Sequence, residues 1–498
     1  MSEPLRYLFP PPERRRVLGP FAAGQLATLG AVAMVSVFGV IRTSPTPRGL
    51  MAGMALLGLT AAAVVVPVRG RVATEWVPLT LRYGLARFRG HTDFRARTPL
   101  HGQAASSLPL PAEVGDLQML AHPQQESILG VVVDRTAGLY SAALEVEGPP
   151  FLLEPTGTQE QLLGRWGSVL ARLAGPGSEL RRLQWILRTT SDDAAALMED
   201  LRAARPRDAA GAADLVRSYL ALIASTATGA ARHLTLVVAQ ISSQHSTRAI
   251  RQAGGGDLGA CAVLTREVDT LARELADLGV EVRRRLDPRS YQGIIRVAFD
   301  PAAQVELDTL ARVNPGQGWG SDWPWPMATE ERWGYYRTAD RAWHRSFTLA
   351  LPLGEVPADW FVPMLLGDST VCRTVAMTVQ PVSRRQANRA VTRTLTRLMA
   401  EEERKQRLGQ LHTAQDAKQE SAAVQRMEEL ADGHADVLYA VTVTVTAPDL
   451  ETLDQACQSV DHVAGMASCE LRQLEGQQAQ AFTWTLPLAR GVDEQRRR

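Results

Sequence analysis

The sequence predicts an α+β or α/β fold, in which an N-terminal transmembrane helical hairpin precedes a cytoplasmic body of two related mixed-sheet α/β sandwich halves. The first observation is a pair of charge-free runs, residues 17–41 and 49–68. The second is a body in which β-rich runs alternate with helical patterns, as in layered α/β domains. The third is a strongly charged, helix-favouring stretch at residues 388–432, which predicts a charged helical arm.

The two charge-free runs predict membrane spans. A bilayer core of about 30 Å needs roughly 20 apolar residues in a helix, and each run is long enough. Prolines in the loop between the runs prevent one continuous helix. Arginines cluster before the first run and after the second, so the positive-inside rule places both termini in the cytoplasm. We therefore expect a multi-pass protein of the inner (cytoplasmic) membrane. A signal peptide or a buried helix pair is the alternative, although a signal h-region is shorter, at about 7–15 residues.

Small residues recur at every fourth position inside both runs, a spacing that permits close helix packing. They are candidates for packing within the hairpin or against another membrane subunit: Ala23, Ala27, Ala31, Gly49 and Gly53. The hairpin domain is predicted to comprise residues 1–71.

Residues 72–126 are predicted to form a membrane-surface helix and a linker. Leu81, Leu85 and Phe88 share one helical face, while arginines occupy another. An ordinary amphipathic helix that packs on the body would show the same periodicity.

The body is predicted to contain two halves, residues 127–299 and 329–490, because a similar order of β-rich runs and helical patterns occurs twice. The connector at residues 300–328 is rich in tryptophan, proline and glycine and cannot be one regular element. Its indoles either insert into a partner or cover the edge of the second half. The candidate partner-binding residues are Trp319, Trp323 and Trp325.

Composition and motifs give no catalytic constellation. A P-loop needs a lysine, and neither Lys405 nor Lys418 lies in the required glycine-rich context. Zinc-protease and nucleophile-elbow patterns are absent from the sequence, and the alternating Gly316, Gly318 and Gly320 lack the preceding strand that a dinucleotide-binding turn needs. The four cysteines lack metal-binding spacing and indicate reduced thiols. We therefore expect no enzyme activity, no cofactor and no metal. A net charge of +1 favours no nucleic-acid partner, although Arg283 to Arg285 form a local cluster.

Several stretches resemble membrane proteins from conjugation and type IV secretion-like gene clusters of actinobacteria. RYLFPPPERRR and the following spans look like a PrgI/VirB-type inner-membrane subunit. The body resembles the motor-less N-terminal domain of the VirB/TraC-class ATPase. The matching stretches are GVVVDRTAGLYSAALEVEG, WHRSFTLALPLGEVPADWFVPMLL, VCRTVAMTVQPVSRRQANRAV and LRQLEGQQAQAFTWTLPLARG. In that class the last kind of segment leads into the motor, whereas this sequence ends at Arg498.

The resemblance implies a non-catalytic structural or docking subunit of the secretion or conjugation apparatus. Its expected partners are the membrane, a separate cytoplasmic P-loop ATPase, other channel subunits and copies of itself. One alternative is a type VII secretion component of the EccE kind, which also combines two early spans with an α/β body. The other is a membrane-anchored enzyme whose acid/base pair the sequence does not reveal.

Overall fold

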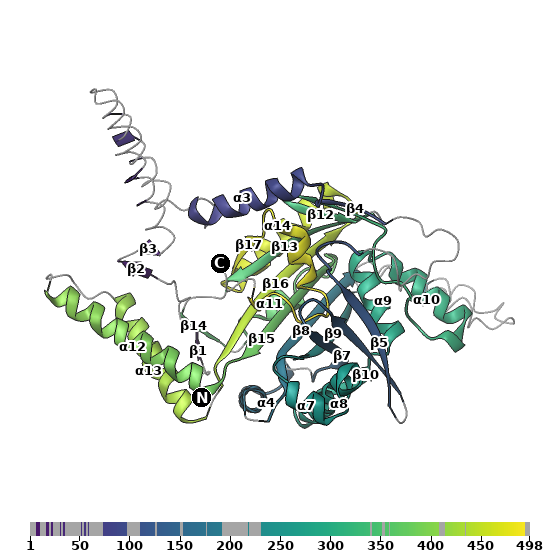
Figure 1. Cartoon of the computed structure of the whole chain (residues 1–498), viewed down its shortest axis with the longest axis horizontal. Helices are drawn as coiled ribbons and strands as arrows, with labels where there is room; N and C mark the ends of the chain where they lie inside the picture. Colours follow the sequence, from purple (N-terminus) through teal and green to yellow (C-terminus); the bar gives the residue numbers. More distant parts are fainter. Residues whose placement is uncertain are drawn as a thin grey trace. The chain divides into compact units, whose positions relative to one another are not determined.

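Figure 1 shows the computed structural model of the chain. The structure describes residues 73–96, 110–124, 127–149, 153–175, 177–191, 231–338, 341–350, 354–357, 359–407, 414–433 and 435–493, with a few short stretches and single positions elsewhere. The chain divides into two compact units. One consists essentially of residues 11–92, and the other of residues 1–10 and 93–497.

The larger unit is built on one sheet of 13 strands. The strand order is β4-β11-β12-β13-β16-β15-β8-β9-β7-β6-β5, with β10 added to β7 and β17 added to β13. Its pairings are antiparallel throughout the described residues. The predicted fold class is therefore wrong: the body is not a pair of mixed-sheet sandwiches but a single antiparallel sheet that extends through both halves.

The first half of the sheet is a βαββαβ unit with one additional strand in front. Its elements are β6 (Ile128–Asp134), β7 (Leu139–Glu147), α4 (Thr156–Leu173), β8 (Leu180–Ser191), β9 (Ala231–Ser242), α7 (Thr247–Gln252), α8 (Gly256–Asp277) and β10 (Glu281–Arg285). Strand β7 pairs with β9 on one edge and with β6 and β10 on the other. The resulting order β8-β9-β7-β10 is that of ferredoxin-like units.

The second half of the sheet has the same arrangement. Its elements are β12 (Tyr335–Thr338), β13 (Ala342–Ala350), α11 (Val362–Leu366), β15 (Arg373–Pro381), β16 (Val437–Ala447), α14 (Leu450–Met466) and β17 (Glu470–Gln473). Strand β13 pairs with β16 on one edge and with β12 and β17 on the other. The two βαββαβ units of the sheet join through β8 and β15, where Thr189 lies opposite Arg373 and Leu183 lies opposite Val379.

The remaining strands of the sheet are β4 (Asp93–Arg95) and β11 (Ala328–Arg332) at one end and β5 (Leu117–Pro123) at the other. A separate two-stranded sheet pairs β1 (Arg6–Phe9) with β14 (Gly354–Pro357).

Helices cover one face of the sheet. Helices α4, α7 and α8 pack on the first βαββαβ unit, and α11 and α14 pack on the second. Val375 and Val379 on β15 point to this face, the first into the core of the second unit and the second into the core of the first. Trp185 and Met377 pack against both of these cores, so the two βαββαβ units share an apolar layer across their junction.

The opposite face is covered by different elements. Asp287 is the N-cap of helix α9 (Pro288–Phe299), and its side chain accepts from the backbone N–H groups of Arg289 and Ser290. Helix α10 (Ala303–Val313), the 3₁₀ turn η5 (Pro315–Gln317) and the tryptophan-rich connector follow. The core on this face also contains α15 (Gln478–Thr483) and the segment after it.

The predicted membrane hairpin and the inner-membrane localisation that depended on it need correction. In the part of the chain that the structure describes, no helix is long and apolar enough to cross a membrane. Most of residues 17–41 and 49–68 lies outside that part. At the start of the first predicted span, β2 (Arg16–Leu18) pairs with β3 (Phe21–Ala22) in place of a helix. The dipeptide Gly19-Pro20 in the sequence between these strands is a turn signal. The prediction of a span considered only the length of the charge-free run and not this signal.

The smaller unit also contains α3 (Ala73–Phe88), where a surface helix was predicted. Leu81, Leu85 and Phe88 are all exposed on it. Its placement at a membrane surface stays a prediction.

Candidate functional site

The chain after β17 crosses one face of the sheet as a mostly irregular segment that we call the C-terminal segment, residues 474–493. Residues 481–489 are all buried in it. Phe482, Leu486 and Leu488 enter the core with α9 and the sheet. Because most of this segment lacks regular backbone pairing, its buried polar groups need partners from elsewhere.

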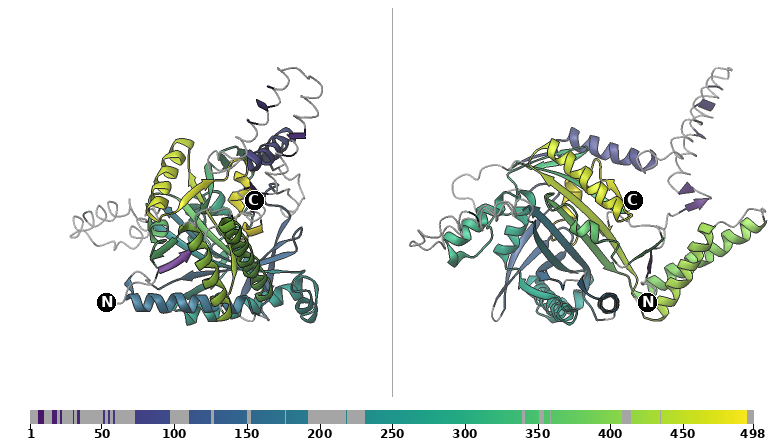
Figure 2. Two further views of the ribbon diagram at one scale, coloured as in Figure 1. Left: turned by 90° about the vertical axis from the view of Figure 1, so that its left-hand side faces the viewer. Right: turned by 180° about the vertical axis from the view of Figure 1, so that it is seen from behind.

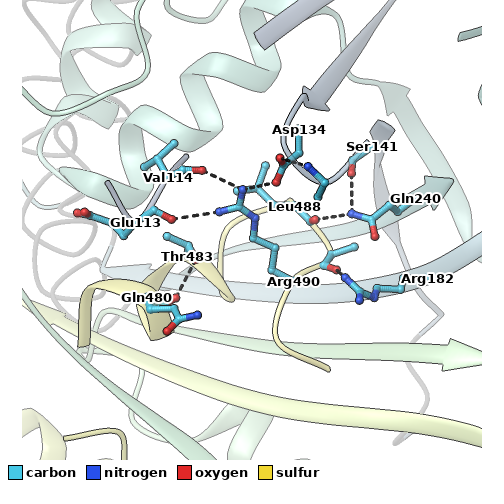
Figure 3. A network of polar contacts seen from close by, with 12 residues as sticks. Glu113, Val114, Asp134, Ser141, Arg182, Gln240, Gln480, Thr483, Leu488 and Arg490 are labelled. Atoms are coloured by element: carbon cyan, nitrogen blue, oxygen red, sulfur yellow. Dashed lines mark hydrogen bonds and ion pairs between the residues drawn. The ribbon is translucent and has the colours of Figure 1, made fainter. Parts of the chain in front are cut away.

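Side chains of the two central strands supply these partners. Gln184 on β8 donates from Nε2 to the carbonyl oxygen of Trp484 (2.7 Å) and accepts at Oε1 from the N–H of Ala489 (2.8 Å). Gln240 on β9 donates to the carbonyl oxygen of Leu488 (2.8 Å) and to the hydroxyl of Ser141 (3.1 Å). The sheet therefore binds this segment through side chain–backbone hydrogen bonds, as Figure 3 shows in part.

Flanking contacts extend this attachment along the segment. Arg182, two residues before Gln184 on β8, donates to the carbonyl oxygen of Ala489 (3.2 Å). Thr378 on β15 donates to the carbonyl oxygen of Arg490 (3.1 Å). Tyr291 on α9 donates to the carbonyl oxygen of Pro487, and burial raises the pKa of this phenol well above its ordinary value. Strands β8, β9 and β15 and helix α9 are thus among the elements that hold the segment.

Arg490 lies at the centre of a charged network (Figure 3). Its guanidinium donates to the carboxylate of Asp134 (2.7 Å) and to the carbonyl oxygens of Glu113 (3.2 Å) and Val114 (2.8 Å). The side chains of Arg490 and Asp134 are each 15 % exposed. Since removing either partner would leave a largely buried charge, we expect both to be needed for stability.

The side-chain carboxyl of Glu113, whose backbone carbonyl accepts from Arg490, has a perturbed pKa. Burial raises its pKa, and hydrogen bonds from the hydroxyls of Tyr336 (2.6 Å) and Thr329 (3.4 Å) partly oppose that rise. The carboxyl of Glu113 therefore holds a proton more tightly than an exposed glutamate does.

A recess of about 280 Å³ opens beside the network. The charged side chains that line it are three arginines and three acids: Arg181, Arg182, Arg490, Glu113, Asp134 and Asp493. Arg182 and Arg490 are paired with Asp493 and Asp134. Since these charges already neutralise each other, the recess offers hydrogen-bonding groups rather than a field of one sign.

Burial keeps the four thiols and one imidazole of the body in their neutral forms. Burial raises the thiol pKa of Cys261, Cys372, Cys457 and Cys469 to about 11. Burial lowers the pKa of His344 to about 3, so its imidazole is neutral at ordinary pH. Within the described residues, no group of three His, Cys, Asp or Glu side chains is placed to hold a metal ion.

The structure places the predicted tryptophans against the core. Trp325 is buried, and Trp319 and Trp323 pack on the same apolar cluster. The indole of Trp319 donates to Asp308 (2.8 Å), and the guanidinium of Arg284 lies 5.6 Å from its ring centre. The connector therefore contributes to the fold, and partner binding by these indoles stays a prediction.

Two other groups singled out from the sequence are placed differently. The arginine cluster on β10 is neutralised, because Arg283 pairs with Glu147, Arg284 with Glu145, and Arg285 with Asp269. The small residues predicted to pack the spans lie outside the described part of the chain: Ala23, Ala27, Ala31, Gly49 and Gly53.

A second candidate site is the helical arm, α12 (Arg384–Arg407) and α13 (Ala414–Ala431). The arm is inserted between β15 and β16, whose last pair joins Pro381 to Val437. Antiparallel neighbours need a loop of only about two to five residues. Figures 1 and 2 show both helices extending away from the sheet. The arm is therefore an addition that the sheet does not need.

Sequence reasoning missed the polar side chains that bind the C-terminal segment. The strand LRRLQWILRT carries Arg182, Gln184 and Arg188 on one of its two faces. Such polar side chains would ordinarily indicate that this face is exposed to solvent. All three are buried. Two features of the sequence could have indicated this burial. Leu183, Trp185 and Leu187 are apolar on the opposite face of the same strand, and the C-terminal stretch FTWTLPL is rich in apolar residues.

No protein-family model matches this chain, and no curated protein matches it significantly.

Proposed function

We propose that this chain is a non-catalytic docking subunit of a type IV secretion-like apparatus, which recruits or positions a separate P-loop ATPase. The observation that carries the proposal is the arm inserted between β15 and β16. Long insertions between neighbouring strands of a compact domain are commonly functional, because closing the strand pair does not require them.

The base of the arm is fixed to the body, which supports a role in positioning a partner. Ala387, Val391 and Leu430 form a small buried cluster between the helices. Arg426 on α13 makes two hydrogen bonds to the carboxylate of Asp436 (2.7 and 2.8 Å), just before β16. A partner bound to the arm would thus be held at a defined place relative to the sheet.

The C-terminal segment gives further support through the resemblance to the VirB/TraC-class ATPase. In that class the corresponding kind of segment leads into the motor. Here Gln184 and Gln240 bind its backbone inside the body. A body that holds this C-terminal segment and also carries a projecting arm is suited to bind an ATPase supplied by another chain.

Co-purification tests the proposal. The full chain is expressed with the P-loop ATPase encoded in the same gene cluster, and each protein is purified through a tag on the other. We expect a stoichiometric complex that withstands gel filtration. A full-length, folded chain that captures none of this ATPase would refute the docking function. Hydrolysis of a substrate by the purified chain alone would favour the enzyme alternative.

A further inference from the structure

The exposed face of α12 carries an unusual run of positive charge. Residues 384–397 contain five arginines and no acidic residue. Four of these arginines recur at every fourth position: Arg385, Arg389, Arg393 and Arg397. Because residues four apart lie next to each other on a helix, at a rise of about 6 Å, these side chains form one row. We call these four residues the arginine row.

The arginine row points away from the side on which α12 packs. Arg385, Arg389 and Arg393 are exposed, whereas Ala387 and Val391 are buried in the arm's core. Arg397 is half-buried, and its Nε lacks a hydrogen-bond partner. Within the described residues, the structure gives none of the four an ion pair, although α12 contains one such pair farther along, Arg407 with Glu403.

Elementary helix electrostatics oppose this arrangement. Like charges four residues apart repel each other. The amino-terminal end of a helix carries a partial positive charge and favours acidic side chains, yet the first turn of α12 begins with Arg384 and Arg385. A local rule broken without compensation inside the fold is typical of a functional surface. An anionic partner would remove this repulsion.

We propose that the arginine row docks an acidic segment of a partner protein. The proposal rests on the docking function above and specifies the chemistry of the partner. Arginine can form paired hydrogen bonds to carboxylates, so a helix with acidic side chains at every fourth position matches the row in both charge and spacing.

The charge distribution favours protein over nucleic acid as the occupant. The chain's net charge is +1, and the other arginine cluster, on β10, is neutralised by neighbouring acids. A broad basic surface, which phosphate backbones require, is thus not built up around the row.

The test measures binding of the full chain to a fluorescent synthetic helical peptide with glutamate at every fourth position. Its glutamine counterpart, a short DNA duplex and vesicles of anionic lipid are the comparison probes. We expect binding to the glutamate peptide alone, weakening as salt is raised. The double variant Arg389→Glu/Arg393→Glu should weaken that binding by at least about tenfold, because it places like charges opposite each other.

The matched control is Arg248→Glu/Arg251→Glu, which changes the net charge equally at two exposed arginines on α7. It should leave the affinity within about twofold, since distant exposed charges are screened. Arg389→Gln/Arg393→Gln provides a variant without charge reversal, and circular dichroism checks that each variant folds. Equal loss in the control, or row-dependent binding of the DNA or the vesicles in place of the peptide, would overturn the proposal.

Co-purification separates this inference from the docking function. If the wild type and the Arg389→Glu/Arg393→Glu variant capture the ATPase equally, the docking function stands and the arginine row is not its surface. If the wild type captures no ATPase, the docking function fails, and peptide binding alone decides the chemistry of the row.

Discussion

Replacing Gln184 by leucine should destabilise the body strongly, although the two side chains are similar in size. Gln184 is fully buried, and its amide bonds both the carbonyl of Trp484 and the N–H of Ala489. Leucine would deprive two buried backbone groups of their partner. Each such loss costs about 1–3 kcal/mol, so we expect the free energy of unfolding to fall by about 2–6 kcal/mol. That is a large part of the roughly 5–15 kcal/mol available to a typical domain.

Urea unfolding, followed by tryptophan fluorescence, measures this loss. Gln244→Leu is the control, because this glutamine is exposed near the end of β9. If the C-terminal segment detaches while the sheet stays folded, limited proteolysis will cleave near Trp484 before the sheet unfolds, and the m-value will decrease. A loss below about 1 kcal/mol with an unchanged m-value would refute the reasoning, since it would mean that the segment does not depend on Gln184.

Three further changes test other parts of the structure. Burial raises the pKa of Glu113, so the folded chain holds this proton more tightly than the unfolded chain, and the free energy of unfolding should fall as the pH rises from about 4.5 toward the raised pKa. Glu113→Gln cannot ionise and should lose that decline, which unfolding curves at several pH values would show. A Cβ at Gly293 would lie 2.8 Å from Cα of Gly320 and 2.9 Å from Cζ3 of Trp319, so Gly293→Ala should cost about 1–3 kcal/mol in urea unfolding. Replacement of residues 382–436 by Asn-Gly should leave the melting of the sheet cooperative but abolish capture of the ATPase, as calorimetry and co-purification would show.

The sequence indicates many of the strands but not the way they join. VCRTVAMTVQPV reads as a strand because β-branched residues recur through it. Val375 and Ala376 are both buried, on opposite faces, which identifies β15 as a central strand. Its pairing with β8, far away in the chain, depends on register and edge complementarity, which periodicity does not encode. Two separate sheets were therefore predicted where the chain forms one.

The binding groups of the C-terminal segment were unpredictable for a related reason. A glutamine in a strand ordinarily faces water, because burying an amide without partners is costly. Gln184 and Gln240 are buried because a distant irregular segment provides a carbonyl and an N–H at the right distance. Such pairing is a property of the tertiary structure. By contrast, the charge pattern of the arm is local, and the sequence alone is enough to show it.

The arm and the C-terminal segment meet at one strand. On β15, Thr378 donates to the carbonyl oxygen of Arg490, and Gln380 accepts from the guanidinium of Arg182 (3.1 Å). The strand ends one residue later, at Pro381, and the arm follows. The base of the arm therefore follows the strand that holds the C-terminal segment, and Arg182 links this strand to Asp493. Under the docking function proposed above, an ATPase bound to the arm would therefore be attached to the same strand that holds the C-terminal segment.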